Sequence, residues 1–176
     1  SEETQNTPKP MIEIGGKPII SHIMQHYSKY GFNDFIICLG YKGYAFKEYF
    51  ANYLLHNSDV TFDYVNNTSQ YHQSRAQKWK VTLVDTGLNS MTGGRVKRIQ
   101  NYFNSGERFM LTYGDGLSNV NISHLIETHN KAGKVCTVTA VAPPGRFGAL
   151  VIEQNEVTDF HEKPSGDGGL INGGYF

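Results

Sequence analysis

The stretch Phe109-Met-Leu-Thr-Tyr-Gly-Asp-Gly116 decides how the rest of the chain is interpreted. Its apolar start, residues 109–111, is typical of a short strand that is covered on both faces by helices. Gly114 and Gly116 allow the backbone to pass close to a ligand, and Asp115 lies between them at the carboxyl end of the strand. In open α/β sheets, ligands bind at that edge. The pattern therefore predicts a carboxylate in a binding site, while an ordinary Gly-Asp-Gly surface turn is the alternative.

Asp115 is the candidate metal ligand. Mg²⁺ usually binds through one or two protein carboxylates and completes its coordination with phosphate oxygens and water. A lone carboxylate at the end of a buried strand suits that arrangement. We therefore predict that Asp115 binds Mg²⁺ together with a substrate that carries phosphate.

Composition bounds the class of protein. The chain has 176 residues, of which 39% are hydrophobic, and this is enough for one globular domain with a core. Sixteen basic and sixteen acidic residues balance, so the charge gives no sign of a nucleic acid polymer or an anionic membrane as partner. The balanced charge does not exclude a small anionic ligand, because binding such a ligand needs only a few local cations.

The two cysteines bear on the compartment. Cys38 lies in the apolar run 35–39 and Cys136 in the apolar run 135–141. They are interpreted as reduced thiols in the core of a cytoplasmic protein, because nothing in their spacing indicates a disulfide framework or a zinc site.

The order of elements predicts an α/β protein. Strands alternate with helices, which favours a three-layer α/β/α sandwich with a mostly parallel, Rossmann-like sheet and a small antiparallel addition at one edge. The polar, aperiodic segment 66–78 is predicted to be a long loop or an excursion, lying at a subunit contact or over a nucleotide. Predicted helices cover residues 20–27, 46–53, 96–103 and 122–129, and predicted strands cover residues 34–39, 60–65, 80–85, 109–111, 135–141, 148–153 and 157–161.

Besides the strand end that carries Asp115, two other segments carry groups that can bind phosphate. Lys9 lies between two prolines, and a Lys ammonium is an effective phosphate binder, although an exposed basic residue in a turn is the alternative. After Gly87, the loop carries Ser90 and Arg95, with Thr92 as a plausible N-cap of the following helix. Lys97 and Arg98 are predicted to form a solvated face.

The last polar segments lie near the end of the chain. His161-Glu-Lys-Pro164 delivers an acid and a base at a strand end, and Asn172-Gly-Gly174 suits hydrogen bonds to sugar hydroxyls or a simple turn. The sequence contains no Ser-His-Asp elbow, no Walker loop and no Gly-x-Gly-x-x-Gly. A carboxylate, two lysines and helix N-termini favour a phosphoryl-type displacement, in which positioning and charge neutralisation provide most of the rate.

With these residues, the sequence resembles the sugar-phosphate nucleotidylyltransferase family over nearly its whole length. The segment Val84-Asp-Thr-Gly87 with Ser90-Met-Thr-Gly-Gly-Arg95 is similar to the cytidylyl branch, because thymidylyl and uridylyl relatives carry a loop with Gln and Pro there. The other motifs that carry the resemblance are Pro8-Lys-Pro-Met-Ile-Glu-Ile-Gly-Gly-Lys-Pro-Ile19, Gly40-Tyr-Lys-Gly43, Tyr113-Gly-Asp-Gly116, Pro144-Gly-Arg-Phe-Gly148, Glu162-Lys-Pro164 and Asn172-Gly-Gly174.

The resemblance implies the reaction of CTP with α-D-glucose 1-phosphate, giving CDP-glucose and pyrophosphate with Mg²⁺ as cofactor. It implies catalytic roles for Lys9, Asp115 and Lys163, with Mg²⁺ on Asp115. The implied nucleotide contacts are Lys9, Gly87, Ser90, Arg95 and Gly114. The implied sugar-phosphate contacts are Gly148, Glu162, Lys163 and Asn172, with Lys163 on the phosphate and Asn172 on the hydroxyls.

The resemblance also sets expectations for the whole protein. The family's Gly-rich loop is expected upstream of Ser1, and a second metal carboxylate is expected after Phe176, so residues 1–176 are interpreted as one catalytic domain of a longer protein. Relatives imply a homo-oligomer. Two alternatives stay open: a sister enzyme that uses dTTP, UTP or GTP, and a non-catalytic module that binds nucleotide sugars.

Overall fold

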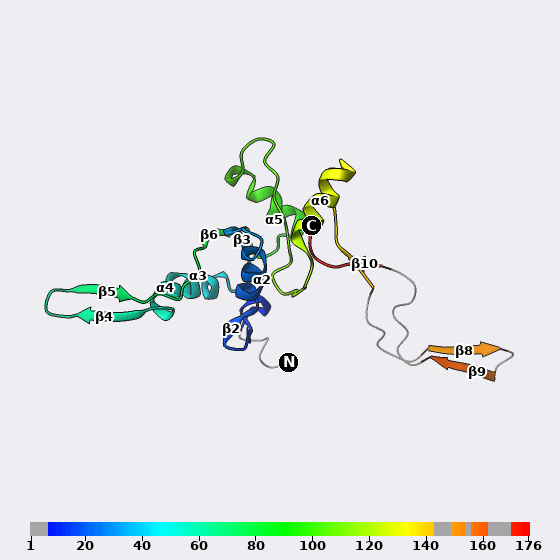
Figure 1. Ribbon diagram of the computed structural model, residues 1–176, viewed down its shortest axis with the longest axis horizontal. Helices are drawn as coiled ribbons and strands as arrows, with labels where there is room; N and C mark the ends of the chain where they lie inside the picture. The colour runs from blue at the N-terminus through cyan, green and yellow to red at the C-terminus, as the bar shows by residue number, and fades with distance from the viewer. Residues whose placement is uncertain (1–6, 143–148, 154–155, 162–169) are drawn as a thin grey trace. The chain divides into compact units, whose positions relative to one another are not determined.

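The computed structural model describes residues 7–142, 149–153, 156–161 and 170–176. Figure 1 draws the chain as a ribbon coloured from the N-terminus to the C-terminus. The chain divides into two compact units. The first unit consists of Ser1–Arg108 and Gly114–Asn119, and the second consists of Phe109–Tyr113 and Val120–Phe176. Each unit is described by itself, and the expectation of one catalytic domain stays a prediction.

A parallel pair of strands lies at the centre of the first unit. β3 (Asp34–Leu39) pairs in parallel with β6 (Lys80–Asp85), in a register that runs from Asp34 opposite Lys80 to Leu39 opposite Asp85. Their apolar composition is typical of parallel strands that helices cover. Both strands were predicted with these bounds. Their carboxyl ends meet at one edge, and this edge positions the turns that carry candidate site residues.

Helices and a short N-terminal segment supply the core around this pair. The segment consists of η1 (Lys9–Met11), β1 (Glu13–Ile14) and β2 (Lys17–Pro18), and the helices are α2 (Ile19–Ser28), α3 (Gly43–Ala51) and α4 (Tyr53–His56). The buried cluster consists of Met11, Ile20, Met24, Leu39 and Phe46. The helical spacing of Ile20 and Met24 places both on the covered face of α2, as the pattern predicts.

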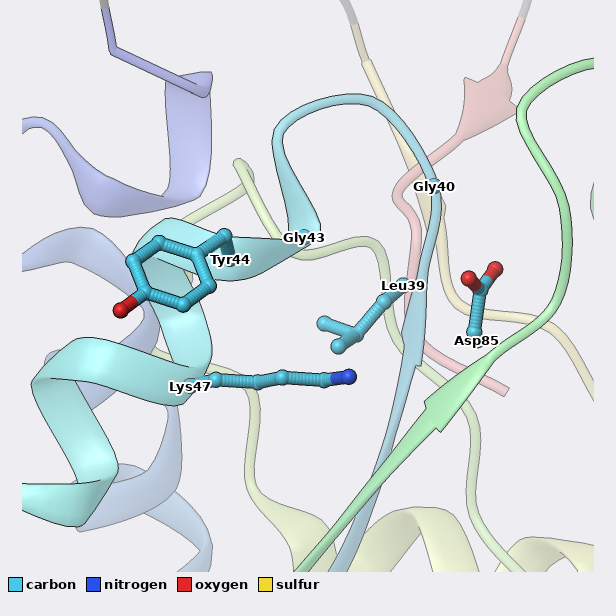
Figure 2. A pocket seen from close by; sticks show the side chains of 6 residues that line it. All are labelled: Leu39, Gly40, Gly43, Tyr44, Lys47 and Asp85. Carbon is cyan, nitrogen blue, oxygen red and sulfur yellow. The ribbon is translucent and has the colours of Figure 1, made fainter.

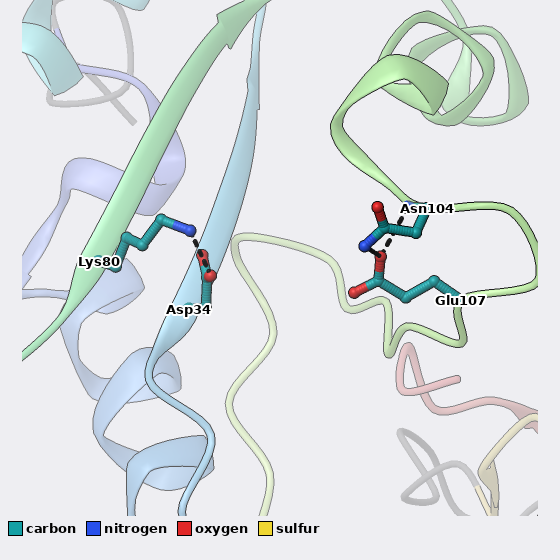
Figure 3. A network of polar contacts seen from close by, with 4 residues as sticks. All are labelled: Asp34, Lys80, Asn104 and Glu107. Atoms are coloured by element: carbon teal, nitrogen blue, oxygen red, sulfur yellow. Dashed lines mark hydrogen bonds and ion pairs between the residues drawn. The ribbon is translucent and has the colours of Figure 1, made fainter.

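At the amino ends of β3 and β6, the side chains are charged and exposed. Lys80 Nζ lies 2.7 Å from Asp34 Oδ2, and both side chains are exposed (Figure 3). The hydrogen bond to Asp34 raises the pKa of Lys80. Nearby in Figure 3, the backbone and side-chain amides of Asn104 donate to Glu107. Exposed contacts of this kind contribute little to stability.

Residues 66–78 do not form one long loop, because part of their first half is a strand. β5 (Thr68–His72) pairs antiparallel with β4 (Asp59–Asp63) to form a hairpin. Every side chain of β5 is exposed, so this strand needs no apolar alternation, and a search for hydrophobic period misses it. The turn is closed by Asp63, whose carboxylate accepts hydrogen bonds from the backbone amides of Val65 and Asn66.

The helix after β6 is shorter than predicted. α5 (Thr92–Arg98) is followed by the 3₁₀ turn η2 (Gln100–Tyr102), with Ile99 buried between them. Thr92 is not the N-cap: Met91 occupies that position without a side-chain bond, and Arg95 N donates to Met91 O. Because the backbone of Thr92 is already helical, its hydroxyl is not placed to cap the helix.

The second unit is built on α6 (Ile122–Ala132). Asn121 caps the helix by accepting a hydrogen bond from His124 N, and Gly133 ends it at a positive φ of 59°. Ile122 and Tyr175 are both buried, with exposed fractions of 0% and 1%. β7 (Ala140–Val141) pairs antiparallel with β10 (Ile171–Asn172), and β8 (Ala149–Glu153) pairs antiparallel with β9 (Glu156–His161), the latter as predicted.

Two expected strands of this unit are absent from the described residues. Residues 109–111 form no regular strand: Leu111 exchanges two backbone hydrogen bonds with Phe176, and Phe109 is exposed. Residues 135–138 are likewise irregular, Thr139 exchanges backbone hydrogen bonds with Tyr175 and Gly173, and only residues 140–141 of that run form a strand. A short apolar run becomes a strand only if partners lie on its edges, and sequence does not specify those partners.

The two cysteines differ. Cys38 is half-buried in β3, and burial raises the pKa of its thiol. Cys136 is exposed, so its expected place in the core is wrong, because the strand that would have buried it does not form. Across the described parts of the chain, no helix has the length and apolar character needed to cross a membrane.

Candidate functional site

The first unit brings two predicted site segments together. Lys9 is exposed in η1, and the next residue, Pro10, packs against Gly114. A Cβ at Gly114 would lie 3.1 Å from Pro10 Cγ, so a larger residue would push the two segments apart. Lys9 and Asp115 are therefore the chain neighbours of the two residues in this contact, Pro10 and Gly114, and the roles predicted for them stay predictions.

Asp115 has the properties of a ligand for a hard cation. Its carboxylate is exposed, and no cluster of three or more acidic, His or Cys groups suited to a metal occurs among the residues that the structure describes. A single exposed carboxylate is compatible with Mg²⁺, which completes its coordination with substrate phosphates and water. The donor set thus fits the predicted metal.

The turn from β6 into α5 is organised around the carbonyl oxygen of Leu39. This oxygen accepts from Thr86 N at 2.9 Å and from Thr86 Oγ1 at 2.8 Å. It also accepts from Arg95 Nη1 at 2.9 Å. Thr86 is fully buried, so this bonding satisfies a polar side chain that would otherwise destabilise the fold. The three donors tie the end of β6 and the start of α5 to the end of β3.

Arg95 acts as a clamp on this turn. Besides Leu39, its Nη1 donates to Thr86 Oγ1 at 2.7 Å, and its Nη2 donates to the Leu88 carbonyl at 3.3 Å. A Cβ at Gly40 would lie 2.6 Å from Arg95 Nη2, so the guanidinium lies directly over the backbone of Gly40. Gly40 of the Gly-Tyr-Lys-Gly motif is therefore explained by the space that Arg95 occupies.

Arg98 is exposed, as predicted, and it also makes hydrogen bonds that the prediction did not include. Although exposed, it donates from Nη1 to the carbonyl oxygen of Thr86 and to Ser90 Oγ. Ser90 Oγ in turn donates to the Thr86 carbonyl. Gly87 has a φ of +88°, and a Cβ there would lie 2.5 Å from Arg98 Nη1. Sequence reasoning missed these contacts of Arg98. The signal for them is Gly87, whose positive φ and missing side chain leave space for the Arg98 guanidinium.

A shallow hollow of about 130 Å³ lies at the same strand edge. It is lined by Leu39, Gly40, Gly43, Tyr44, Lys47 and Asp85. Figure 2 shows Lys47 extending from α3 toward the ends of β3 and β6, where Asp85 lies. The hollow at the carboxyl edge of the parallel pair therefore contains one cation, Lys47, and one carboxylate, Asp85.

In the second unit, the predicted sugar contact Asn172 belongs to an ordered polar group. Its Oδ1 accepts from Gly174 N at 2.8 Å, and its Nδ2 donates to Tyr113 Oη at 3.1 Å. Gly174 has a φ of +78°, and a Cβ there would lie 3.0 Å from the Tyr113 ring. Thr112 Oγ1 donates to the Gly174 carbonyl at 2.8 Å. The glycine in Asn172-Gly-Gly174 therefore admits the tyrosine ring, a role that sequence reasoning did not assign to Tyr113.

Three predicted sugar-phosphate residues lie outside the described residues. These are Gly148, Glu162 and Lys163. The roles assigned to them stay predictions, as do the ligand contacts assigned to Lys9, Gly87, Ser90, Arg95, Gly114, Asp115 and Asn172.

Comparison with known proteins identifies the class. The sequence pattern of the family described as nucleotidyl transferase matches residues 4–176. The chain belongs to this family. The resemblance drawn from the motifs is thereby confirmed.

More similar relatives narrow the class. The chain is 58% identical over 176 residues to a glucose-1-phosphate cytidylyltransferase of Salmonella typhi, matching 100% of this chain and 68% of that protein. It is 44% identical over 177 residues to a probable glucose-1-phosphate cytidylyltransferase of Bacillus subtilis, with the same shares covered. These similarities place the chain in the glucose-1-phosphate cytidylyltransferase branch, as the β6–α5 turn sequence predicts.

Solved structures support the fold. The crystal structure of HddC from Yersinia pseudotuberculosis matches with a TM-score of 0.59 at 21% identity, over 97% of this chain and 66% of that one. A UDP-glucose pyrophosphorylase structure matches with a TM-score of 0.53 at 17% identity, over 98% of this chain and 69% of that one. At these identities the likeness concerns the fold, and it confirms the predicted α/β class.

Proposed function

We propose that the full-length protein transfers the cytidylyl group of CTP to α-D-glucose 1-phosphate, giving CDP-glucose and pyrophosphate. The observation that carries the proposal is the 58% identity to a glucose-1-phosphate cytidylyltransferase along the entire chain. A phosphate oxygen of the sugar phosphate forms a bond to the α-phosphorus of CTP. The bond from that phosphorus to the bridging oxygen of pyrophosphate breaks.

The reaction needs no general base. The second pKa of a phosphate monoester is about 6, so the attacking phosphate is already mostly dianionic at neutral pH. The main barrier is repulsion between two polyanions, and fixed cations at the reacting phosphates lower it. The residues proposed for this task are Lys9, Arg95 and Lys163.

Lys9 and Asp115 are proposed to act on the triphosphate. The contact between Pro10 and Gly114 supports this, because it brings together the two segments that carry Lys9 and Asp115. Asp115 would hold Mg²⁺, which supplies charge neutralisation at the phosphate oxygens when bound. Lys9 would add a compact positive charge, and Gly114 would allow the nucleotide to approach the backbone.

The β6–α5 turn is proposed to bind the nucleotide through Gly87, Ser90 and Arg95. The guanidinium of Arg95 has five N–H donors, and the hydrogen bonds found here engage Nη1 and Nη2, so the group can hold the turn and still contact an anion. Asn172 is proposed to bind sugar hydroxyls. Gly148, Glu162 and Lys163 would complete the sugar-phosphate contacts, with the resemblance as their support.

A cytoplasmic homo-oligomer is part of the proposal. The turn of the β4–β5 hairpin exposes Tyr64 and Val65 almost completely, at 90% and 93%, which suits contact with a second copy. Both cysteines are free, in keeping with a reducing compartment. Light scattering of the full-length protein that returns a monomer mass would contradict the oligomer.

The function is tested by pyrophosphate release from the full-length protein with glucose 1-phosphate, Mg²⁺ and CTP, UTP, dTTP or GTP in turn. We expect CTP to give turnover well above the other three. A preference for another triphosphate would indicate a sister enzyme, and no release with any of them would favour the non-catalytic binding module.

Substitution of Asp115 tests the metal site. We expect Asp115→Ala to lower kcat/KM by about 100-fold or more, because a charge-neutralising group is lost from the transition state. Asp59→Ala, which removes an exposed carboxylate from β4, is the matched control and should leave turnover unchanged. Full Mg²⁺-dependent turnover of Asp115→Ala would contradict the assigned role.

A further inference from the structure

The second unit contains a polar group that the motifs alone do not assign. It consists of Tyr113, Asn172 and Gly174, joined by hydrogen bonds from Gly174 N to Asn172 Oδ1 at 2.8 Å and from Asn172 Nδ2 to Tyr113 Oη at 3.1 Å. Tyr113 and Asn172 are 59 positions apart in the sequence. The contact is therefore a product of the tertiary fold.

The bonding determines which way the amide of Asn172 is turned. A backbone N–H can only donate, so the atom that faces Gly174 N is the carbonyl oxygen of the amide. The amide nitrogen then faces Tyr113, whose oxygen accepts the bond. As a result, the O–H of Tyr113 remains available as a donor.

The ring of Tyr113 is itself held in place. Its centroid lies 5.8 Å from that of Phe176 in an edge-to-face arrangement. On another side, Gly174 approaches the ring so closely that a Cβ would lie 3.0 Å from Cδ2. A ring fixed by two neighbours presents its hydroxyl at a defined point within the second unit.

We propose that Tyr113 is a positioning residue for the sugar: its hydroxyl fixes the amide of Asn172 in the orientation that binds sugar hydroxyls. This inference rests on the proposed function, because it assigns a new residue to the sugar side of that site. The group offers a second N–H of Asn172, the Tyr113 O–H and a remaining lone pair of Oδ1. Donors and an acceptor together suit neighbouring hydroxyls of a sugar.

The test is Tyr113→Phe in the full-length protein, which removes the hydroxyl and keeps the ring. We expect the KM for glucose 1-phosphate to rise about 3- to 10-fold, the range that corresponds to one neutral hydrogen bond. The kcat and the KM for CTP should stay at the wild-type values. Tyr102→Phe, at an exposed tyrosine of η2, is the matched control and should change none of the three.

A double-mutant cycle separates positioning from an independent contact. If Tyr113 acts through Asn172, then Tyr113→Phe should add no further rise in KM to the variant Asn172→Ala. The preference for glucose 1-phosphate over its monodeoxy analogues should also shrink in Tyr113→Phe, which a loss of stability alone would not produce.

The outcomes distinguish the two proposals. Wild-type protein that forms no CDP-glucose would overturn the proposed function. Active wild-type protein with an unchanged sugar KM in Tyr113→Phe would overturn the role of Tyr113 alone. Additive effects in the double mutant would likewise overturn it, because they would show that the two side chains act independently.

Discussion

Two polar regions of the first unit are held in different ways. The β4–β5 hairpin is held by the backbone ladder between Asp59–Asp63 and Thr68–His72, and most of its side chains are exposed. The turn from β6 to α5 is held by side chains that donate to backbone carbonyls, centred on the buried Thr86. A ladder uses groups that every residue has, whereas the turn depends on particular side chains.

The difference indicates where sequence changes are tolerated. In the hairpin, a substitution alters a side chain in water and leaves the ladder in place. In the turn, loss of one partner leaves a buried polar group without a hydrogen bond, which costs more than the bond itself contributes. The region proposed to bind the nucleotide is thus the one whose shape depends on residue identity.

The largest effect is expected from Thr86→Val, which keeps the shape of the side chain and removes its hydroxyl. Arg95 then loses an acceptor within a buried region, and we expect unfolding free energy to fall by about 1–3 kcal/mol. The midpoint of urea denaturation measures this. Thr82→Val, at a half-buried site in β6, the strand that precedes Thr86, should be close to neutral. Equal losses for both variants would remove the special status of the turn.

An intermediate effect is expected from Gly40→Ala. The added Cβ would lie 2.6 Å from Arg95 Nη2, so the guanidinium must leave its carbonyl partners, at a loss of about 1 kcal/mol. The control has the opposite sign: Gly94→Ala lies in α5 with open space around it, and should stabilise by about 0.5–1 kcal/mol. Thermal denaturation compares the two, and stabilisation by Gly40→Ala would contradict the clamp.

The smallest effect is expected from Asp63→Ala in the hairpin turn. We expect a change in Tm of roughly 2 °C or less, together with faster proteolysis of the turn. Asp59→Ala, at the far end of β4, should leave the proteolysis rate unchanged. A loss of stability as large as that of Thr86→Val would break the contrast between the two regions.

The pH dependence of the same turn sharpens this prediction. Hydrogen bonds from the side chain and backbone of Asn66 hold the pKa of Asp63 below its ordinary value. The contribution to stability is therefore complete above the ordinary pKa of about 3.9, and is lost as the pH falls through the lower folded-state pKa. The amide chemical shift of Val65 should titrate with a midpoint below that ordinary value. A midpoint at or above it would contradict the assigned hydrogen bonds.

The sequence by itself determined the α/β class, the bounds of β3 and β6, and the branch of the family. Apolar periodicity follows directly from burial, and the motifs Lys9-Pro, Gly114-Asp115 and Ser90 to Arg95 persist as local strings of residues. The sequence also predicted the antiparallel pair β8–β9, because alternation around a polar turn is a local signal.

Only the tertiary structure decided which residues act together. β5 was missed because a strand exposed on both faces has no hydrophobic period, and residues 109–111 were overestimated because strand pairing depends on distant partners. The contacts of Arg98 with Ser90 and of Tyr113 with Asn172 follow from close approaches at Gly87 and Gly174. The sequence shows where the glycines are. Only the fold determines which side chain packs against each of them.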